Sequence, residues 1–391
     1  MTSRPTAYAH PTDGSTLLPI LKSFLPQSYS LYRRLQCPFR SPHSYVLASF
    51  PLTTTTPPPC FAALYLDRSC RPETECWIFL SSEAPSHSPP ADPNQPSKDP
   101  SEGEWTTEPH RPCPNCTAAL TTLLHHIHTT LPFSASIHAA ELSGSTPPPN
   151  PGSQKYTHYV HTPSILLLGS VHASTASTLG AQHLDLIRQD LPGFQTPYTK
   201  FLFRTEGPES VRMREVARRP LPAGLRWGTL TRGEEFELVR RRTEIPRFAN
   251  TMAGLRSVGV FPEAALSSVR RQGGGGGGEA GGEAEQAADD MPIAWAFLGP
   301  DASLSALHVE PEFRGKGLAK AVAVKLWKEG MGWFDENEGR HGQEGWLVSS
   351  DVSPDNKEST GVCRSLGGEA GWEVYWVRVD LSRLGKGGGS E

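Results

Sequence analysis

The sequence predicts an α/β (α+β) protein with a mixed central sheet flanked by helices. In both halves of the 391-residue chain, apolar runs with the period of a strand alternate with stretches that have the period of an amphipathic helix. Glycine and proline, at 37 residues each, gather in discrete segments, which indicates insertions between folded elements. We therefore expect two units, residues 1–206 and 207–384, and a flexible tail at 385–391.

The first unit is predicted to start with a helix at residues 17–24 and a strand meander. Residues 82–112 are rich in Ser, Pro, Asp and Glu and are expected to form a disordered insertion. A second Pro-rich insertion is expected at residues 143–154. The remaining elements are strands at 44–50, 60–67 and 75–81, a helix at 117–131, strands at 137–142 and 164–172, and a helix at 184–188.

The second unit is predicted to contain a hairpin with an expanded loop. Residues 267–271 and 292–298 are expected to pair, and the Gly-rich insertion at 273–290 between them cannot form a core. The other elements are strands at 225–230, 306–309, 345–352 and 372–380, and helices at 234–242, 246–256, 318–328 and 355–366.

Residues 304–328 contain a segment whose chemistry can be named. An apolar strand ends at Pro311, and the basic loop from Arg314 to Gly317 then opens an amphipathic helix. Glycines at 315 and 317 let backbone amides converge at a helix N-terminus, where the helix dipole favours an anion. The segment predicts a phosphate-binding loop. A Rossmann or P-loop site is the alternative, but both G-x-G-x-x-G and the G-K-S/T ending are missing.

The order VEPEFRGKGLA resembles the acyl-CoA signature of the GNAT superfamily of N-acyltransferases. That loop has Gln or Arg, two residues, Gly, one residue, then Gly or Ala, and Arg314, Gly317 and Ala319 fall on these positions. The segment DVSPDNKESTGVCRSLG resembles a second GNAT helix. The segments PIAWAFLG and TEIPR are closest in pattern to the glycine N-acyltransferase-like branch. The resemblance implies a GNAT domain in the second unit and a degenerate GNAT-like unit before it, where ILLLGSVH and YTKFLF occupy corresponding places.

The resemblance implies that acetyl-CoA or another acyl-CoA binds as co-substrate. The strand of the signature splays from its neighbour so that its backbone pairs with pantetheine, and an amide near Leu307 polarises the thioester carbonyl. Alternatives remain for three side chains: Lys316 and Lys320 as solvated residues, and Asn356 as a helix cap. The implied CoA-binding residues are Leu307, His308, Val309, Arg314, Gly315, Lys316, Gly317, Leu318, Ala319, Lys320, Asn356 and Ser359.

The groups for proton transfer depart from the GNAT pattern. Ser303 and Ser305 occupy positions where many members have Glu, and a hydroxyl with its ordinary pKa is not a base near neutrality. Asp301 and His308 are the substitutes, although a lone strand histidine is more often structural. Cys363 aligns with the tyrosine that protonates the leaving thiolate, with packing as its alternative role. Another candidate acid is Tyr375. Together with Leu307, these residues are the predicted catalytic set.

No metal is expected. Cys113 and Cys116 have C-x-x-C spacing, but no second pair follows at the distance of a zinc finger, and seven scattered cysteines fit reduced thiols. The histidines at 125, 126 and 128 lack the i, i+4 spacing of a ligand pair. Residues 240–242 and Arg247 form a basic group that could attract an acidic acceptor or the acyl-CoA, although neighbouring glutamates are expected to pair with it.

Charge and hydrophobicity argue against two classes of partner, nucleic acids and membranes. A net charge of −4 argues against a nucleic-acid partner, and no apolar run is long enough for a membrane span. We expect a cytoplasmic protein, with a mitochondrial location as an unsupported alternative, and make no prediction of its oligomeric state. The predicted function is acetyl transfer from acetyl-CoA to a primary amine of a small molecule. The alternatives are a protein N-acetyltransferase and a non-catalytic acyl-CoA-binding or scaffold protein.

Overall fold

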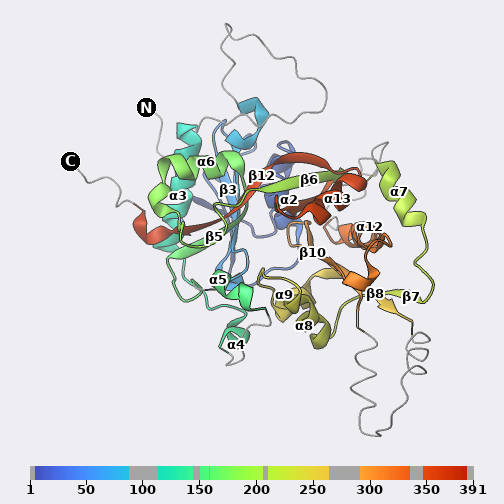
Figure 1. Ribbon diagram of the computed structural model, residues 1–391. Helices are drawn as coiled ribbons and strands as arrows, with labels where there is room; N and C mark the ends of the chain where they lie inside the picture. Colours follow the sequence, from blue (N-terminus) through green and yellow to red (C-terminus); the bar gives the residue numbers. More distant parts are fainter. Residues whose placement is uncertain are drawn as a thin grey trace.

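The structure, a computed structural model, describes residues 5–87, 113–143, 150–157, 159–205, 210–263, 291–334 and 347–384. Within these ranges the strands form an eight-stranded mixed sheet and a four-stranded antiparallel sheet, with helices on their faces (Figure 1). The α/β class predicted from the sequence is therefore confirmed. The order in the large sheet is β1-β2-β3-β4-β5-β12-β6-β11, and that in the small sheet is β10-β9-β8-β7.

The large sheet is antiparallel apart from the parallel pairing of β4 with β5 in the described residues. Strands β2, β3 and β4 pair antiparallel in chain order, as the predicted meander requires. The side chains of β3, β4 and β5 are buried on both faces of the sheet. The strands are β1 (Tyr8–His10), β2 (Ser44–Ala48), β3 (Ala62–Asp67), β4 (Cys76–Leu80), β5 (Ile165–His172), β6 (Tyr198–Arg204), β11 (Leu347–Val352) and β12 (Glu369–Asp380).

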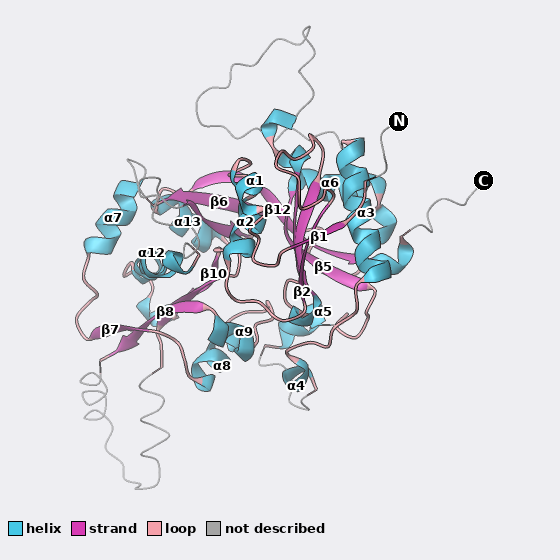
Figure 2. Ribbon diagram, turned by 180° about the vertical axis from the view of Figure 1, so that it is seen from behind, coloured by secondary structure: helices cyan, strands magenta, loops and turns pink. Residues whose placement is uncertain are grey.

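Helices cover the two faces of the large sheet (Figure 2). On one face α1 (Leu18–Lys22) and α2 (Tyr29–Gln36) pack on alternate residues of β2, β3 and β4. On the other face α3 (Pro114–Thr130) and α6 (Ala173–Gln182) pack on the remaining residues of these strands and on β5 and β12. The alternation of faces follows from the two-residue period of a strand.

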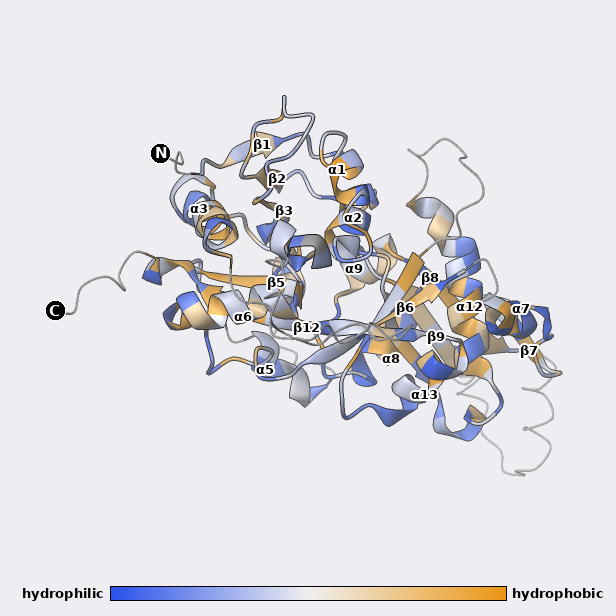
Figure 3. Cartoon of the chain, turned by 90° about the horizontal axis from the view of Figure 1, so that it is seen from above, coloured by the Kyte–Doolittle hydropathy of each residue, from blue (hydrophilic) through white to orange (hydrophobic). Residues whose placement is uncertain are grey.

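The small sheet supports the predicted signature segment. Its strands are β7 (Leu225–Gly228), β8 (Arg256–Pro262), β9 (Ala294–Leu298) and β10 (Leu304–Val309). One face packs against α12 (Leu318–Gly330), whose apolar residues lie on β8 and β9. The other packs against α8 (Gly233–Arg241) and α9 (Ala249–Gly254). Figure 3 shows the hydrophobic colour of β8 and α12 beside the more hydrophilic α7 (Val211–Arg218) and α13 (Lys357–Ser365).

The two halves of the chain exchange strands. The last strand of the second half, β12, lies between β5 and β6 of the first half, and β6 lies between β12 and β11 of the second. Side chains of the first half also hold the turn before β10: the Tyr29 hydroxyl donates to the Ala302 carbonyl at 3.3 Å, and the Trp77 indole donates to Asp301 at 3.2 Å. The start of β10 is thus fixed from both halves.

Three predicted elements are wrong. Residues 137–142 are not a strand, because the Ala-Ala-Glu-Leu run forms the short helix α4 (Ala139–Leu142) beside the buried His138. Residues 184–188 contain a 3₁₀ turn, and the helix lies earlier, as α6. β9 pairs with β8 (256–262) on one side and with β10 on the other, in place of the predicted partner; residues 267–271 themselves lie outside the described residues.

The predicted insertions are only partly covered by the structure. Residues 81–87 form two 3₁₀ turns that bury Glu83, so the sequence around 82–87 is ordered where an insertion was predicted. The 3₁₀ turn Pro151–Ser153 and the short α5 (Gln154–Thr157) follow the second Pro-rich segment. Residues 88–112, 144–149, 273–290 and 385–391 lie outside the described residues. Within the described ranges, every helix is too short or too polar to cross a bilayer.

Candidate active site

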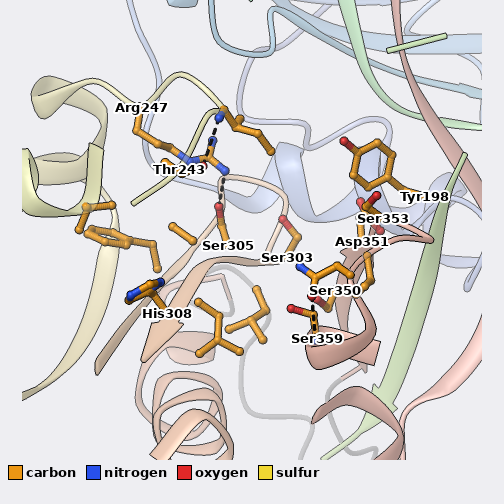
Figure 4. Close-up of a pocket in the computed structure, with 18 of the residues that line it drawn as sticks. Tyr198, Thr243, Arg247, Ser303, Ser305, His308, Ser350, Asp351, Ser353 and Ser359 are labelled. Atoms are coloured by element: carbon orange, nitrogen blue, oxygen red, sulfur yellow. Dashed lines mark hydrogen bonds between the residues drawn. The ribbon is translucent and has the colours of Figure 1, made fainter. Parts of the chain in front are cut away.

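A cavity opens where β10 and β11 separate. An isolated parallel bridge joins Ser303 to Ser349, and beyond it β10 pairs with β9 in the small sheet while β11 pairs with β6 in the large sheet. The cavity measures about 1600 Å³ and is lined by β10, the loop 313–320, the N-terminal part of α13 and residues of the first half. Figure 4 shows Ser303, Ser305 and Ser350 on its walls. The separation leaves room for an extended ligand between the strands.

A β-bulge interrupts β10 at the centre of this cavity. Ser305 pairs with Phe297 and His308 pairs with Trp295, so Ala306 and Leu307 together face one residue of β9. Ala306 has a φ of 52°, in the left-handed region that residues with a side chain rarely adopt. Because the bulge adds one residue, Ser305 and His308 lie on the same face of the strand. His308 nevertheless faces away from Leu307 and Val309, as strand alternation predicts, because it stacks on Trp295 whereas Leu307 and Val309 pack on the side of α12.

The loop before α12 has the backbone that its glycines predict. Gly315 and Gly317 have φ values of 78° and 79°, and Gly317 is the N-cap of α12. A Cβ at either position would meet no protein atom within 4 Å among the described residues, so the glycines serve backbone conformation and leave open space in front of the loop. This space, at the positive end of a helix, suits a phosphate. All the residues from Arg314 to Lys320 line the cavity.

Two basic side chains of the loop are held close to it. The Arg314 guanidinium donates to the Val309 carbonyl at 3.1 Å, which ties the loop to the end of β10. The Lys316 ammonium lies 5.0 Å from the centre of the Phe313 ring. Asn356 caps α13, because its side-chain oxygen accepts the Ser359 amide hydrogen at 2.9 Å. The capping role weighed for Asn356 is thus present, and Asn356 and Ser359 also line the cavity.

Of the candidate bases, His308 has the position and environment that best suit proton transfer. Its ring stacks on Trp295 with centres 4.7 Å apart, and its Nε2 is buried without a hydrogen-bond partner among the described residues. Glu310 Oε2 lies 3.7 Å from this nitrogen and pairs with Arg242. Burial lowers the pKa of His308 below 6.5, and Glu310 only partly opposes this shift. A histidine that is neutral at pH 7 can accept a proton.

Asp301 and the two serines are already engaged. Asp301 accepts hydrogen bonds from the Ser303 hydroxyl at 2.6 Å and from the Trp77 indole at 3.2 Å. Ser305 accepts one from the Arg247 guanidinium at 2.8 Å (Figure 4). Burial lowers the pKa of Arg247, although the charges of Glu73 and Asp301 oppose the shift. Arg247 therefore belongs to the cavity wall, whereas the sequence placed it only in a basic group with glutamate partners.

The two candidate acids lie in different places. Cys363 is buried and lines the cavity, and burial raises the pKa of its thiol to about 11, so the thiol stays protonated but is a weak acid. Tyr375 is on β12, packs with Phe194 in the core of the first half and donates its hydroxyl to Glu373 at 2.9 Å. Tyr375 is not among the cavity-lining residues of the described chain, and we do not retain it as an acid.

Residues of the first half complete the cavity, and no local motif marked them. Asp351 of β11 forms a buried ion pair with Lys200 of β6. Arg34 of α2 stacks on the Tyr65 ring at 3.8 Å, and its Nε and Nη1 have no hydrogen-bond partner among the described residues. Glu73 and Tyr198 also line the cavity. The sequence does not reveal the pairing of β6 with β11, which sets Lys200 beside the cavity-lining Asp351 although the two residues are 151 positions apart.

Comparison with known proteins also indicates an acyl-CoA N-acyltransferase, and the match lies in the first half of the chain. The family described as the acyl-CoA N-acyltransferase verG N-terminal domain matches residues 4–201, half of the sequence. The chain belongs to the GNAT superfamily of acyl-CoA N-acyltransferases. Membership implies transferase activity with acyl-CoA as co-substrate and an amine as acceptor. This family match covers the unit that the sequence alone identified only by pattern.

Solved structures resemble the chain at low sequence identity. A Drosophila protein is 11% identical with a TM-score of 0.50, over 96% of this chain and 98% of that chain. A tandem GNAT protein from the clavulanic acid biosynthesis pathway is 12% identical with a TM-score of 0.43, over 98% and 99% of the two chains. A putative GNAT acetyltransferase from Novosphingobium aromaticivorans is 16% identical with a TM-score of 0.29, over 48% of this chain and 65% of that one. No curated protein matches the sequence.

Proposed function

We propose that this GNAT protein transfers an acetyl group from acetyl-CoA to a primary amine of a small molecule. The observation that carries the proposal is the separation of β10 from β11 above a glycine loop at the head of α12. The loop 315–320 would hold the pyrophosphate, and pantetheine would lie along β10. The thioester then lies at the bulge, where the amide of Leu307 is the proposed donor to the carbonyl oxygen.

In the proposed reaction, the neutral amine attacks the carbonyl carbon directly. The C–N bond forms, the C–S bond breaks, and the amine proton passes to His308, whose lowered pKa keeps it neutral near pH 7. The CoA thiolate leaves with the electron pair of the C–S bond and takes a proton from Cys363 or from solvent. Holding the two reactants in one cavity supplies part of the rate. We place Asp301 in a structural role, because Ser303 and Trp77 occupy it.

A small-molecule acceptor is supported by the position of the cavity between the halves. Arg34, Glu73 and Trp77 of the first half and Arg247 of the second line one cavity, so the thioester would lie inside the fold. Arg34 and Arg247 would favour an acceptor that carries a negative group as well as its amine. A protein amine would have to enter between the two halves, and for this reason a protein acceptor is the second choice.

A non-catalytic acyl-CoA-binding protein is the competing candidate. It is favoured by Ser303 and Ser305, which stand where a carboxylate base is expected and are already hydrogen-bonded. The two candidates differ in one experiment, which compares the equilibrium affinity for acetyl-CoA with the rate of CoA release across a panel of amino acids, polyamines and arylamines. Release that depends on the amine supports the enzyme. Tight binding with no release above hydrolysis for any amine supports the binding protein.

A further inference from the structure

Three cysteines and one histidine meet at the edge of the large sheet, outside the cavity described above. Cys60 lies two residues before the start of β3, His87 ends the 3₁₀ turn Pro85–His87, Cys113 is the N-cap of α3, and Cys116 is in the first turn of that helix. Their four ligand atoms all lie within 4.8 Å of one another. None of the four is among the residues that line the acyl-CoA cavity. The C-x-x-C pair therefore has two further partners that come from distant parts of the sequence.

The distances in this cluster fit a tetrahedral metal site. With Zn–S bonds of about 2.3 Å and Zn–N bonds of about 2.0–2.1 Å, a tetrahedron separates two sulfurs by about 3.8 Å and a sulfur from a nitrogen by about 3.5 Å. Cys60 Sγ lies 3.7 Å from Cys113 Sγ and 3.5 Å from His87 Nε2, and Cys116 Sγ lies 3.8 Å from the same nitrogen. A disulfide would need sulfurs about 2.05 Å apart and would leave the third cysteine and the histidine without a role.

The surroundings of the cluster also suit bound thiolates. Cys113 is the N-cap of the 17-residue helix α3, with Pro114 at the next position. The positive end of the helix dipole stabilises the negative charge of coordinated sulfur at Cys113 and Cys116. Cys116 is buried, and the other three residues are partly exposed, so an ion can enter from solvent while the site excludes bulk water on one side.

We propose that Cys60, His87, Cys113 and Cys116 bind one Zn²⁺ ion in a closed, structural site. Three thiolates and one imidazole are a ligand set that zinc accepts, and four protein ligands leave no position for a substrate. The ion would join the start of β3, the turn before residue 88 and the N-terminus of α3. His87 and Cys113 come from described stretches that are separated in the sequence, so the metal would link these two stretches and fix α3 on the sheet. The expectation of no metal rested on the missing second pair, which the fold replaces with Cys60 and His87.

The first test measures the metal in the purified full-length chain by elemental mass spectrometry, after growth with zinc and purification under reducing conditions. We expect about one zinc per chain in the wild type, as a four-ligand site requires. Cys60→Ser and Cys116→Ser should lose most of it. The matched controls are Cys37→Ala, a buried cysteine outside the cluster, and His126→Ala on the same helix as Cys116; both should retain the zinc.

The second test begins with the wild-type chain, so its first result does not depend on whether a ligand variant folds. Co²⁺ added to the chelated wild-type chain should give the visible absorption bands of tetrahedral cobalt and the near-ultraviolet bands of thiolate ligation. His87→Cys should still bind one Co²⁺, with its bands shifted to those of a four-thiolate site. A folded wild-type chain that takes up neither ion, or equal zinc loss in the control variants, would overturn the proposal. So would a Cys60–Cys113 disulfide found by mass spectrometry in place of the metal.

Discussion

Lys200 and Asp351 form an ion pair at 2.7 Å in which the two side chains are only 1% and 6% exposed. Lys200 lies on β6 of the first half and Asp351 on β11 of the second, and the two residues are directly paired across the strands. Ser170 of β5 donates a further hydrogen bond to Asp351 at 3.0 Å. The ion pair thus joins the two halves beside the acyl-CoA cavity.

Removal of one charge of this pair should be strongly destabilising. Lys200→Met leaves the carboxylate of Asp351 buried without its counter-charge, and we expect a loss of about 3–5 kcal/mol in the free energy of unfolding. Urea denaturation followed by circular dichroism measures it. The double variant Lys200→Met/Asp351→Leu should recover most of the loss. A single variant as stable as the wild type would show that the pair does not hold the halves together.

Gly317→Glu should abolish acyl-CoA binding. Its side chain would project into the open space where the pyrophosphate is proposed to lie, and its charge would repel the phosphates. Calorimetry with acetyl-CoA measures the affinity. Gly317→Asn isolates the strain of the φ of 79°, which Asn tolerates better than most residues. Gly332→Glu is the matched control, because a Cβ at Gly332 also meets no described atom and this residue is outside the cavity. Unchanged affinity in Gly317→Glu contradicts the phosphate assignment.

His308→Gln should remove one ionisation from the pH profile of kcat/KM. A base acts in its neutral form, so activity due to His308 falls as the pH drops through a pKa below 6.5. Protonation of the amine substrate affects kcat/KM of the wild type and of the variant equally. The ratio of wild-type to variant kcat/KM therefore isolates His308, and it should rise with pH to a plateau of about 10²–10⁴, the usual range for a general base. A ratio that is constant with pH would assign His308 a structural role on Trp295.

Glu83→Gln should change how stability depends on pH. Burial raises the pKa of Glu83 to about 8, although hydrogen bonds from Thr175 and the Leu80 amide oppose the shift. The folded state holds the proton more tightly than the unfolded state, so this contribution to stability is complete below pH 4.5 and is lost as the pH rises toward 8. Both donors bond to Oε1, which an amide oxygen replaces. We expect the variant to exceed the wild type in melting temperature at pH 8.5 and to show less advantage at pH 5; equal differences at both pH values would contradict the raised pKa.

Local sequence patterns were sufficient for most of the second half. The strand, glycine loop and helix at residues 304–330 are encoded within one short segment, and so the loop conformation and its place in the cavity could be predicted. The bulge at Ala306 was not foreseen, because nothing in an apolar run marks the extra residue. Strand β8 was missed: the predicted helix was extended to Arg256, the first residue of the strand, whereas α9 ends at Gly254.

Long-range pairing explains what the sequence did not reveal about the site. Arg34, Glu73 and Tyr198 of the first half line one cavity with residues of the second half because strands of both halves share one sheet, and no spacing along the chain records this arrangement. The same holds for the metal cluster, in which Cys60 precedes Cys113 by 53 residues. Functional residues that lie within one segment could be predicted from the sequence, whereas sites formed by residues from distant segments could be identified only from the structure.

The most direct test of the proposed function measures amide formation from acetyl-CoA by mass spectrometry, with the wild type and Gly317→Glu assayed against the same panel of small amines. We predict an N-acetylated product from at least one amine, formed in equal amount with free CoA and absent with Gly317→Glu. Saturable acetyl-CoA binding by the wild type with no acetylated amine from any member of the panel would contradict catalysis and leave a binding protein.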